Sequence, residues 1–575
     1  MKRIIAMLLL TAMLATTMFG CGFDPDDKGS IIPLYIGSEQ SNYDPTAVLY
    51  DKDTVKYLGL VFQGLTVMTS EGKIEKGLAK EWYTKTDERR GEYFMYFELN
   101  ESKWSDGRQL LADHFVYAWK RLLSPETKSE AAALLFDIKN AKAVKAGEMS
   151  IDNLGIAAVD NLLIEVQFEK EIDYNLFLEA VSSPALAPMR DDVVIGHEDT
   201  WATTLEEATF NGQFTLKTME KGKATGFEKA NGYRASSKDD EEVSPLKYVK
   251  PYKLLEDRTK DLAGQLSMFN NGEIYYLGQL TKSDYESNKA NLVTQPLLST
   301  LTIYFNNTKK ALSSADGRKG LSMALDRNQI ASIIGCGTKA ATGFVSDGFY
   351  DASFGSSFRS VGGDVISASA DAAKAKDLIK SGGATGSLTL TYLENDLNSE
   401  IADYCISAWS TAGASVKAQP LAKKKYEEAL KSGSFDMIML DVQGLSTNAV
   451  SVLAPYATRY SGSVVSVADD SKGYAPHVTG FENADYDAAI DAVYAASTMS
   501  ERASLLHTAE KLLAESMPAA PLAFYYDYYL VSSELKNVKS SAYGYRLLED
   551  AELKDYAEKN AAYEAKQADD GSAAA

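Results

Sequence analysis

The sequence WSDGRQLLADHFVYAWKRLLSP, residues 104–125, carries the clearest structural pattern in the chain. Its first four residues are typical of a turn, because Gly107 can adopt a positive φ without steric cost. Asp113 can cap the helix that is expected to follow. The apolar residues of that helix recur at a spacing of three or four and therefore share one face: Phe115, Ala118, Trp119 and Leu122. The stretch predicts a turn and then an amphipathic helix packed on a core.

The rest of the chain alternates between strand patterns and helix patterns. Apolar runs with β-branched and aromatic residues predict strands at 31–36, 93–99, 161–168, 388–393 and 435–440. Two further helices are expected, one over 371–380 and one that starts at a Ser500 cap and stops before Pro518. The mixture predicts an α/β (α+β mixed) protein. A length of 575 residues exceeds what one core usually supports, so two or three lobes are expected.

The composition excludes some classes of partner. With 80 acidic and 59 basic residues, the formal net charge is −21, and such a chain is repelled by nucleic acid and by anionic lipid. The 33 tyrosines can line a cleft that holds varied ligands, because each offers a flat apolar ring and one hydroxyl, or they can simply pack in the core. We therefore expect a globular protein that does not bind nucleic acid.

The amino-terminal residues predict export. Residues 1–20 combine a basic start, a short apolar run and small residues, which is the pattern of a signal peptide. Residues 18–21 resemble the lipobox of bacterial lipoproteins, which implies lipidation of Cys21; a plain secreted protein with a spare thiol is the alternative. Residues 21–30 are polar and indicate a flexible tether. The chain is expected in the cell envelope or periplasmic space, held at the outer face of the membrane by its lipid alone.

Sequence patterns of catalysis are missing. The chain contains no Gly-x-Ser-x-Gly elbow, no phosphate-binding loop and no His-Glu-x-x-His motif. Its four histidines and three cysteines show no zinc-ligand spacing. We therefore expect no catalytic residue, metal or cofactor, and a secreted enzyme or a structural surface protein is the weaker alternative. Cys336 and Cys405 can form a disulfide or remain two thiols.

Several further motifs follow residues 104–125 in order along the chain. They are NGQF at 211–214, YFNN at 304–307, ALDR at 324–327 and PAAPL at 518–522. With these motifs the sequence resembles, over about residues 31–550, the family-5 extracellular solute-binding proteins. Members of that family are the oligopeptide- and dipeptide-binding components of ATP-binding-cassette (ABC) importers.

The resemblance implies a two-lobed, periplasmic-binding-protein-like fold with a hinge and an additional small domain. Domain I would be discontinuous and would consist of residues 31–68, 195–298 and 515–550. Domain II would be small and cover residues 69–194, and domain III would be continuous over 299–514. Residues 551–575 would form a partly disordered tail. Chain crossings near Leu298 and Met517 would form the hinge. The resemblance implies a monomer that delivers an oligopeptide to importer permease subunits; the alternative ligands are a sugar, a metal chelate or a signalling peptide.

The resemblance also implies which residues contact the ligand. They are Ser38, Glu39 and Gln40 in domain I, Tyr304 near a crossing, and Leu440, Asp441, Val442, Gln443 and Gly444 in domain III. The family strand continues as Gly-Trp-x-x-Asp, and its Asp pairs with the amino terminus of a peptide. Here Asp441, Val442 and Leu445 occupy those three places. An ammonium buried against Leu445 would be costly, unless Asp441 or Glu39 supplies the anion.

Overall fold

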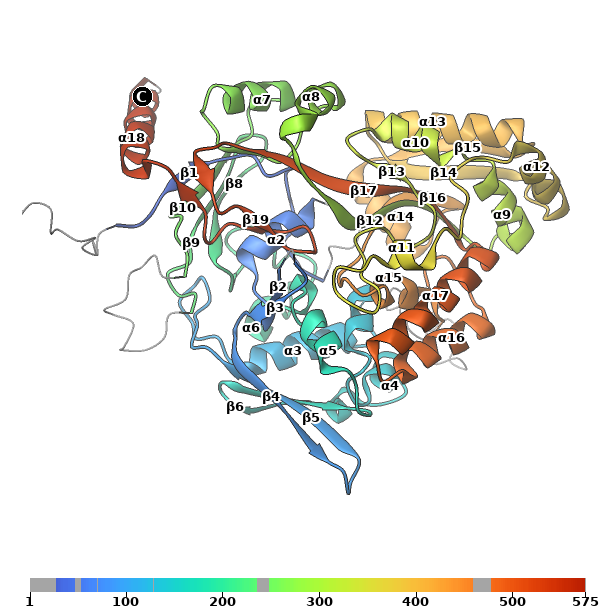
Figure 1. Cartoon of the computed structure of the whole chain (residues 1–575), viewed down its shortest axis with the longest axis horizontal. Coiled ribbons are helices and arrows are strands. Elements are labelled where there is room, and N and C mark those ends of the chain that lie inside the picture. Colours follow the sequence, from blue (N-terminus) through green and yellow to red (C-terminus); the bar gives the residue numbers. More distant parts are fainter. Residues whose placement is uncertain are drawn as a thin grey trace, which may run out of the picture.

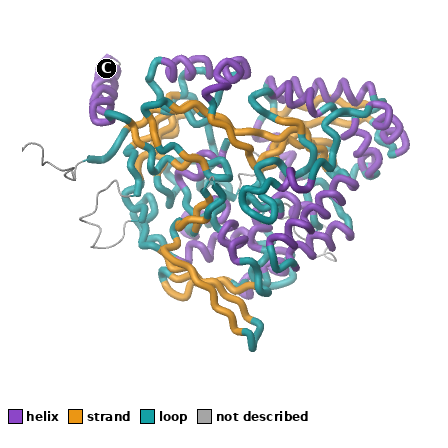
Figure 2. The backbone as a smooth tube through the Cα atoms, in the orientation of Figure 1, coloured by secondary structure: helices purple, strands orange, loops and turns teal. Residues whose placement is uncertain are grey.

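The computed structural model describes residues 27–46, 53–69, 71–127, 129–234, 248–458 and 477–573. The predicted signal peptide, Cys21 and the start of the tether lie outside these described residues. Three main sheets with helices packed against them confirm the mixed α/β class (Figures 1 and 2). In the described part of the chain, no helix has both the length and the apolar character needed to cross a membrane.

The first sheet has the strand order β1-β10-β9-β8. Its strands are β1 (Ile31–Pro33), β10 (Lys253–Asp257), β9 (Ala224–Lys229) and β8 (Phe214–Glu220). The predicted strand over 31–36 is shorter, because the chain leaves β10 and forms a bridge to Leu277 at Tyr35. The buried helix α2 (Thr54–Val61) covers this sheet, with Tyr57 stacked on Phe227.

The second sheet has the order β4-β5-β7-β6 and includes the hairpin at the bottom of Figure 1. Its strands are β4 (Ala79–Asp87), β5 (Glu92–Leu99), β7 (Leu163–Phe168) and β6 (Ile156–Asp160). The helix expected after residue 111 is α3 (Ala112–Leu123), and its four predicted core residues are all buried. The predicted Asp113 cap is wrong: Leu111 occupies the cap position, and its N–H donates to His114 Nδ1 at 3.0 Å.

The third sheet has the order β11-β17-β12-β16-β14-β15, with β13 beside β17. Its strands are β11 (Tyr276–Leu277), β12 (Val293–Phe305), β13 (Lys339–Ala340), β14 (Ser387–Leu393), β15 (Ser415–Leu421), β16 (Met437–Gln443) and β17 (Ala519–Val531). Helices α13 (Asp396–Thr411) and α14 (Lys423–Ser432) connect β14, β15 and β16 as parallel crossovers.

The remaining elements surround these sheets. The small strands are β2 (Thr66–Met68), β3 (Ile74–Lys76), β18 (Leu535–Lys536), β19 (Lys539–Ser540), β20 (Arg546–Leu547) and β21 (Glu552–Leu553). The helices are α4 (Ala141–Lys145), α5 (Tyr174–Ala180), α6 (Asp191–Val194), α7 (Leu262–Asn270), α8 (Lys282–Asn288), α9 (Ala315–Met323), α10 (Arg327–Ile334), α11 (Phe358–Gly362), α12 (Ala372–Ser381), α15 (Val450–Leu453), α16 (Ala484–Ala495) and α17 (Met499–Ser516). Helix α17 is capped by Thr498, not by the predicted Ser500, because the Thr498 hydroxyl accepts from the Glu501 N–H.

Two long strands, β12 and β17, run side by side across the molecule (Figure 1). Their pairing changes register between Pro296 and Thr300, opposite Tyr526 and Phe524. The predicted crossing at Leu298 falls inside this irregularity. Met517 lies before β17 and ends α17 in a left-handed conformation, φ 46°. The shared break of the two strands therefore lies near Leu298 and Tyr525.

The carboxyl-terminal tail, expected to be partly disordered, forms helix α18 (Tyr556–Ala573). Its first turns dock on the start of the fold: Asn560 Oδ1 accepts from Ile31 N at 2.9 Å, and Asn560 Nδ2 donates to Gly29 O at 3.0 Å. Lys559 pairs with Glu534 at 2.7 Å. The small, polar residues of the tail predict a frayed helix followed by disorder, and these contacts hold the first turns of the helix in place.

Both cysteines in the described part of the chain are free thiols. Cys405 is fully buried in α13, and Cys336 follows α10 and is partly exposed. Of the two alternatives for this pair, the structure therefore shows the thiols.

Candidate functional site

The molecule has two lobes that touch each other. We call the part built on the first two sheets the first lobe, and the part built on β12 to β16 with its helices the second lobe. Arg502 of α17 donates to both oxygens of Asp137 in the first lobe, at 3.1 and 3.0 Å. Tyr494 of α16 donates from its hydroxyl to Ala133 O at 2.8 Å. The lobes are therefore in a closed arrangement.

A buried carboxylate lies at the centre of this contact. Glu179 of α5, in the first lobe, accepts hydrogen bonds from Ser446 Oγ, from Thr447 N at 2.6 Å and from Thr447 Oγ1 at 2.9 Å, all in the second lobe. Tyr543 OH donates a further bond at 2.6 Å. Burial raises the pKa of Glu179, and these donors partly offset that rise. Four donors fill the acceptor capacity of one carboxylate, so this group acts as a bond between the lobes.

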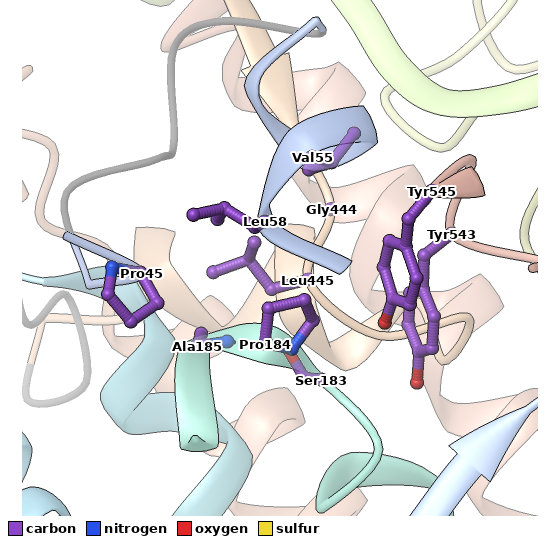
Figure 3. A pocket seen from close by; sticks show the side chains of 10 residues that line it. All are labelled: Pro45, Val55, Leu58, Ser183, Pro184, Ala185, Gly444, Leu445, Tyr543 and Tyr545. Atoms are coloured by element: carbon purple, nitrogen blue, oxygen red, sulfur yellow. Dashed lines mark hydrogen bonds between the residues drawn. The ribbon is translucent and has the colours of Figure 1, made fainter. Parts of the chain in front are cut away.

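A small pocket lies beside Glu179, where several distant segments meet (Figure 3). It is narrow, with about 230 Å³ of space between atoms when the adjoining open solvent is counted. Its lining comes from the loop before α2, from α2, from the turn around residue 184, from the end of β16 and from the β19–β20 turn. The lining residues are Pro45, Val55, Leu58, Ser183, Pro184, Ala185, Gly444, Leu445, Tyr543 and Tyr545. Tyr543 and Tyr545 stack with ring centroids 5.2 Å apart and form one wall. The pocket therefore touches both lobes.

The predicted contacts of domain I are anchored to the start of α2. Ser38 Oγ donates to Asp53 Oδ2 at 2.8 Å, and Gln40 Oε1 accepts from Thr54 Oγ1 at 2.7 Å. Glu39 is exposed and accepts from Gly222 N at 2.9 Å. The same helix supplies Val55 to the pocket. These bonds hold the segment 38–40 in place close to the lobe junction.

The predicted contacts of domain III lie on β16 and directly after it. Leu440 and Gln443 are buried, while Asp441 and Val442 are partly exposed. Gly444 donates its N–H to Leu298 O at 2.6 Å, and a Cβ at this position would lie 2.4 Å from Phe349 Cζ. Only glycine therefore fits where β16 meets the strand break of β12.

Two buried oxygens at the end of β16 lack hydrogen-bond partners in the described structure. They are Gln443 Oε1 and Ser299 Oγ, on residues that face each other across β16 and β12. The Gln443 amide nitrogen is used, since it donates to Gly444 O at 2.9 Å. Buried polar groups are rarely left unpaired in native proteins. These two oxygens are therefore candidates to bond a ligand or a bridging water.

Tyr304 is not brought to the pocket. Its side chain is 1% exposed and packs edge-to-face on His477, with centroids 5.1 Å apart, and on Tyr456. Sequence reasoning also missed Glu179, the turn around residue 184 and the two stacked tyrosines. These residues have no motif of their own, and only the folding of distant segments brings them together.

Comparison with known proteins identifies the family. The model of the bacterial extracellular solute-binding proteins, family 5 (middle), matches residues 73–463. The chain belongs to this family. Family-5 proteins bind solutes outside the cell, as the family name states. The match covers Glu179 and the β16 segment.

Relatives and solved structures agree with this assignment. The dipeptide-binding protein DppE of Bacillus subtilis is 26% identical over 89% of this chain and 90% of its own. A solved oligopeptide ABC transporter substrate-binding domain from Bacillus anthracis superposes with a TM-score of 0.74, at 22% identity, over 91% of this family-5 chain and 99% of its own. These likenesses confirm the two-lobed binding-protein fold.

Two solved structures of one relative superpose on this chain to different extents. A structure of the Escherichia coli murein tripeptide-binding protein MppA gives a TM-score of 0.72 over 92% of this chain and 99% of its own, at 24% identity. The structure of MppA described as its unliganded open form gives only 0.56, over 92% and 98%. The open form superposes less well, as expected for a chain whose lobes are in contact.

Proposed function

We propose that this family-5 protein captures oligopeptides between its lobes and delivers them to an ABC importer. The observation that supports this best is the closed lobe contact, in which one buried carboxylate joins both lobes beside a pocket. The relatives point to the ligand, since DppE is named for dipeptides and the matched structures include oligopeptide and murein tripeptide binders. The protein itself traps and releases the ligand and does not change it.

The proposed binding mode uses backbone hydrogen bonds. An extended peptide pairs with a strand edge through its own N–H and C=O groups, which makes binding tolerant of side-chain identity. The segments 38–40 and 440–444 lie on opposite sides of the lobe junction. Gln443 Oε1 and Ser299 Oγ are the buried, unpaired oxygens available there. We assign ligand contact to these segments and leave Tyr304 in the core.

The proposed hinge is the shared break of β12 and β17. At this point both strands pass between the lobes and lose regular pairing, next to Leu298 and Tyr525. Small φ/ψ changes in strand termini or irregular segments are enough to rotate one lobe against the other. Closure removes water from the ligand and strengthens each polar contact.

The proposed location is the outer face of the cell membrane. The predicted signal peptide exports the chain. Lipidation of Cys21 would then hold the protein, a monomer, at the membrane near the importer permease. Each buried CH₂ of an acyl chain contributes about 0.8 kcal/mol of membrane affinity. In cells, Cys21→Ser should move the protein from the membrane fraction into the soluble fraction; continued membrane retention would contradict the anchor.

The test of ligand class is a thermal-shift screen of the mature chain against peptides of defined length. A ligand that binds only the folded state stabilises it by RT ln(1 + [L]/Kd), about 2.7 kcal/mol at 100 times Kd. We expect peptides to raise the melting temperature and native mass spectrometry to find peptides in protein purified from its host. A sugar or metal chelate found in their place, with no response to peptides, would overturn the peptide assignment.

A further inference from the structure

We propose that the free edge of strand β4 pairs with the same edge of a second copy of this chain, about a two-fold axis at Tyr83. The pairing is a weak, symmetric self-association that forms where copies are concentrated. In dilute solution the protein stays a single chain. The contact lies on the β4–β5 hairpin of the first lobe, so it adds to the proposed function without depending on it.

Strand β4 is an outer strand of the second sheet. It pairs with β5 on one side, and the strand order ends there. After a register shift between Ala79 and Glu81, residues 81–87 pair regularly with β5, and within the described structure no strand lies on their other side. The β4–β5 hairpin extends away from the molecule at the bottom of Figure 1. The unpaired N–H and C=O groups of such an edge are a template for another strand.

The other edges of the three main sheets are short or interrupted, as far as the structure describes them. β15 contains Pro420, which cannot donate to a ladder, and β1 has three residues and ends in Pro33. The pairing of β8 shifts after Leu216 and that of β6 after Ala158, while β11 has two residues. Prolines, register shifts and short strands are the usual protection of an edge. Residues 81–87 of β4 have none of these, so this edge is suited to a partner strand.

The exposed face of this edge carries Glu81, Tyr83 and Lys85. Alternate residues of a strand face the same side of a sheet, and all three are exposed, Tyr83 by 52%. Tyr83 stacks on its β5 neighbour Tyr96, with ring centroids 5.0 Å apart. Across β5, Glu81 faces Glu98, a like charge. Among the described residues, neither Glu81 nor Lys85 has an ion-pair partner. The face therefore offers one negative charge, one ring and one positive charge in order.

A two-fold axis at Tyr83 makes this face complementary to itself. In a two-fold symmetric contact, what one copy offers to the other is returned in full. In antiparallel pairing about Tyr83, Glu81 lies opposite Lys85 of the second copy, and the same pair occurs again by symmetry. The Cβ atoms of directly opposite residues are about 4.5–5.5 Å apart, which allows both ion pairs. The stacked rings of Tyr83 and Tyr96 continue into those of the second copy.

The same charges disfavour the neighbouring registers. With the axis at Thr84, Glu81 would face Asp87, and with the axis at Lys85, this lysine would face itself. Like charges directly opposite each other on a sheet are destabilising. Charge therefore selects the register centred on Tyr83. One strand edge is small beside the interfaces of stable complexes, which bury about 1,200–2,000 Å², so the association is weak.

Cysteine cross-linking tests the register. The mature chain with Cys21→Ser, Cys336→Ser and Cys405→Ala receives Glu81→Cys or Lys85→Cys, and each variant is oxidised alone and in an equal mixture. We expect disulfide-linked dimers in the mixture, because directly opposite Cα atoms are about 4.5–5.5 Å apart, as a disulfide requires. In each variant alone the two cysteines are four residues out of register and should link little. Equal linking in all three samples would show random collision and overturn the register.

Charge reversal tests the contact itself, by sedimentation velocity at concentrations up to about 1 mM. Glu81→Lys or Lys85→Glu turns both ion pairs into like charges and should weaken self-association about tenfold. The double variant exchanges the two charges and should restore it. The control is Lys376→Glu, the same change of charge at an exposed site on α12 in the second lobe, which should have little effect.

The remaining outcomes are also decisive. A wild-type chain that stays monomeric up to this concentration and forms no cross-link overturns the proposal, as does self-association that the double variant fails to restore. A cross-link from Lys85→Cys to a different protein, in place of a second copy, would assign the edge to another partner and overturn it as well. None of these results bears on ligand capture, which the thermal-shift screen tests separately.

Discussion

At the scale of single residues, Glu179 has the clearest consequence for function. It lies in the first lobe, and three of its four hydrogen bonds come from Ser446 and Thr447 of the second lobe. Hydrogen bonds to a charged group contribute about 1.5–3 kcal/mol each in favourable geometry. These bonds can form only when the lobes are closed. We therefore expect closure of the lobes, and with it retention of a ligand, to depend on the Glu179 carboxylate.

Replacing Glu179 by Gln should weaken ligand binding by about 10- to 100-fold, because the closed state loses roughly 1–3 kcal/mol of charge-assisted bonding. The loss should appear mainly as a faster dissociation rate, measured by surface plasmon resonance. Glu165→Gln is the matched control, since Glu165 bonds Tyr96 inside the first lobe at 2.6 Å. An unchanged dissociation rate in Glu179→Gln would show that the bond does not hold the lobes together.

A second residue predicts pH dependence. Burial raises the pKa of Glu549 to about 7, above its usual value near 4.3 when unfolded. Between these two values the folded state binds more protons than the unfolded state. The stability contributed by this group is therefore present below about pH 4 and is lost as pH rises to about 7.

Glu549→Gln should remove this part of the pH dependence. The free energy of unfolding of the wild type, minus that of the variant, should fall by roughly 1–3 kcal/mol between pH 5 and pH 8. Urea unfolding at each pH measures both values. Glu552→Gln, at an exposed carboxylate paired with Lys250, serves as the control and should change little. A difference between wild type and Glu549→Gln that does not vary with pH would contradict the raised pKa.

At the scale of elements, helix α18 illustrates what the tail does. Asn560 bonds the backbone of Gly29 and Ile31, so the end of the chain holds its start. Figure 1 shows α18 at the edge of the first lobe, at the far side from the second lobe. The predicted lipid tether ends at residue 30. The helix therefore fixes the point at which the fold would leave its anchor.

Deletion of residues 556–575 should lower the free energy of unfolding by about 1–4 kcal/mol, since a few net hydrogen bonds and one ion pair are lost. Hydrogen exchange should increase at residues 29–33, which lose their partner. Ligand affinity should stay within about twofold, because α18 supplies no lining residue of the pocket. A large loss of affinity would show that the tail reaches the binding site.

Several elements were predicted from sequence because local patterns determine them. The face of α3, with Phe115 and Trp119 buried, follows from spacing alone, and the helix expected over 371–380 is α12 (Ala372–Ser381). The predicted caps of α3 and α17 were wrong because each helix begins two residues earlier, after Leu111 and after Thr498. The end of β1 was wrong because the chain changes its partner strand at Tyr35.

At the scale of the whole molecule, the proposed function depends on movement of the two lobes about the proposed hinge, the break in β12 and β17. The cross-lobe bonds of Glu179, Arg502 and Tyr494 describe one end of that movement. The unliganded open form of MppA superposes on this chain with a lower TM-score than the other MppA structure does. An equilibrium between two such states, shifted by ligand, is the expected behaviour.

This movement can be measured by energy transfer between dyes on the two lobes. Val159 in the first lobe and Leu397 in the second are exposed and can carry cysteines, in a chain with Cys21→Ser, Cys336→Ser and Cys405→Ala. Ligand should raise transfer efficiency as the lobes close. A dye pair within the first lobe, at residues 159 and 83, should show no change. Constant transfer across the lobes with bound ligand would contradict the hinge.

The sequence by itself determined the fold class and the family, because these depend on local spacing and on contiguous motifs; the ligand segments at 38–40 and 440–444 stay predictions. Only the tertiary structure decided that Glu179, Leu58, Leu445 and Tyr543 meet at one place. The physical reason is distance along the chain. A pocket formed by segments about a hundred or more residues apart has no periodicity or motif, and its chemistry exists only once the lobes have packed together.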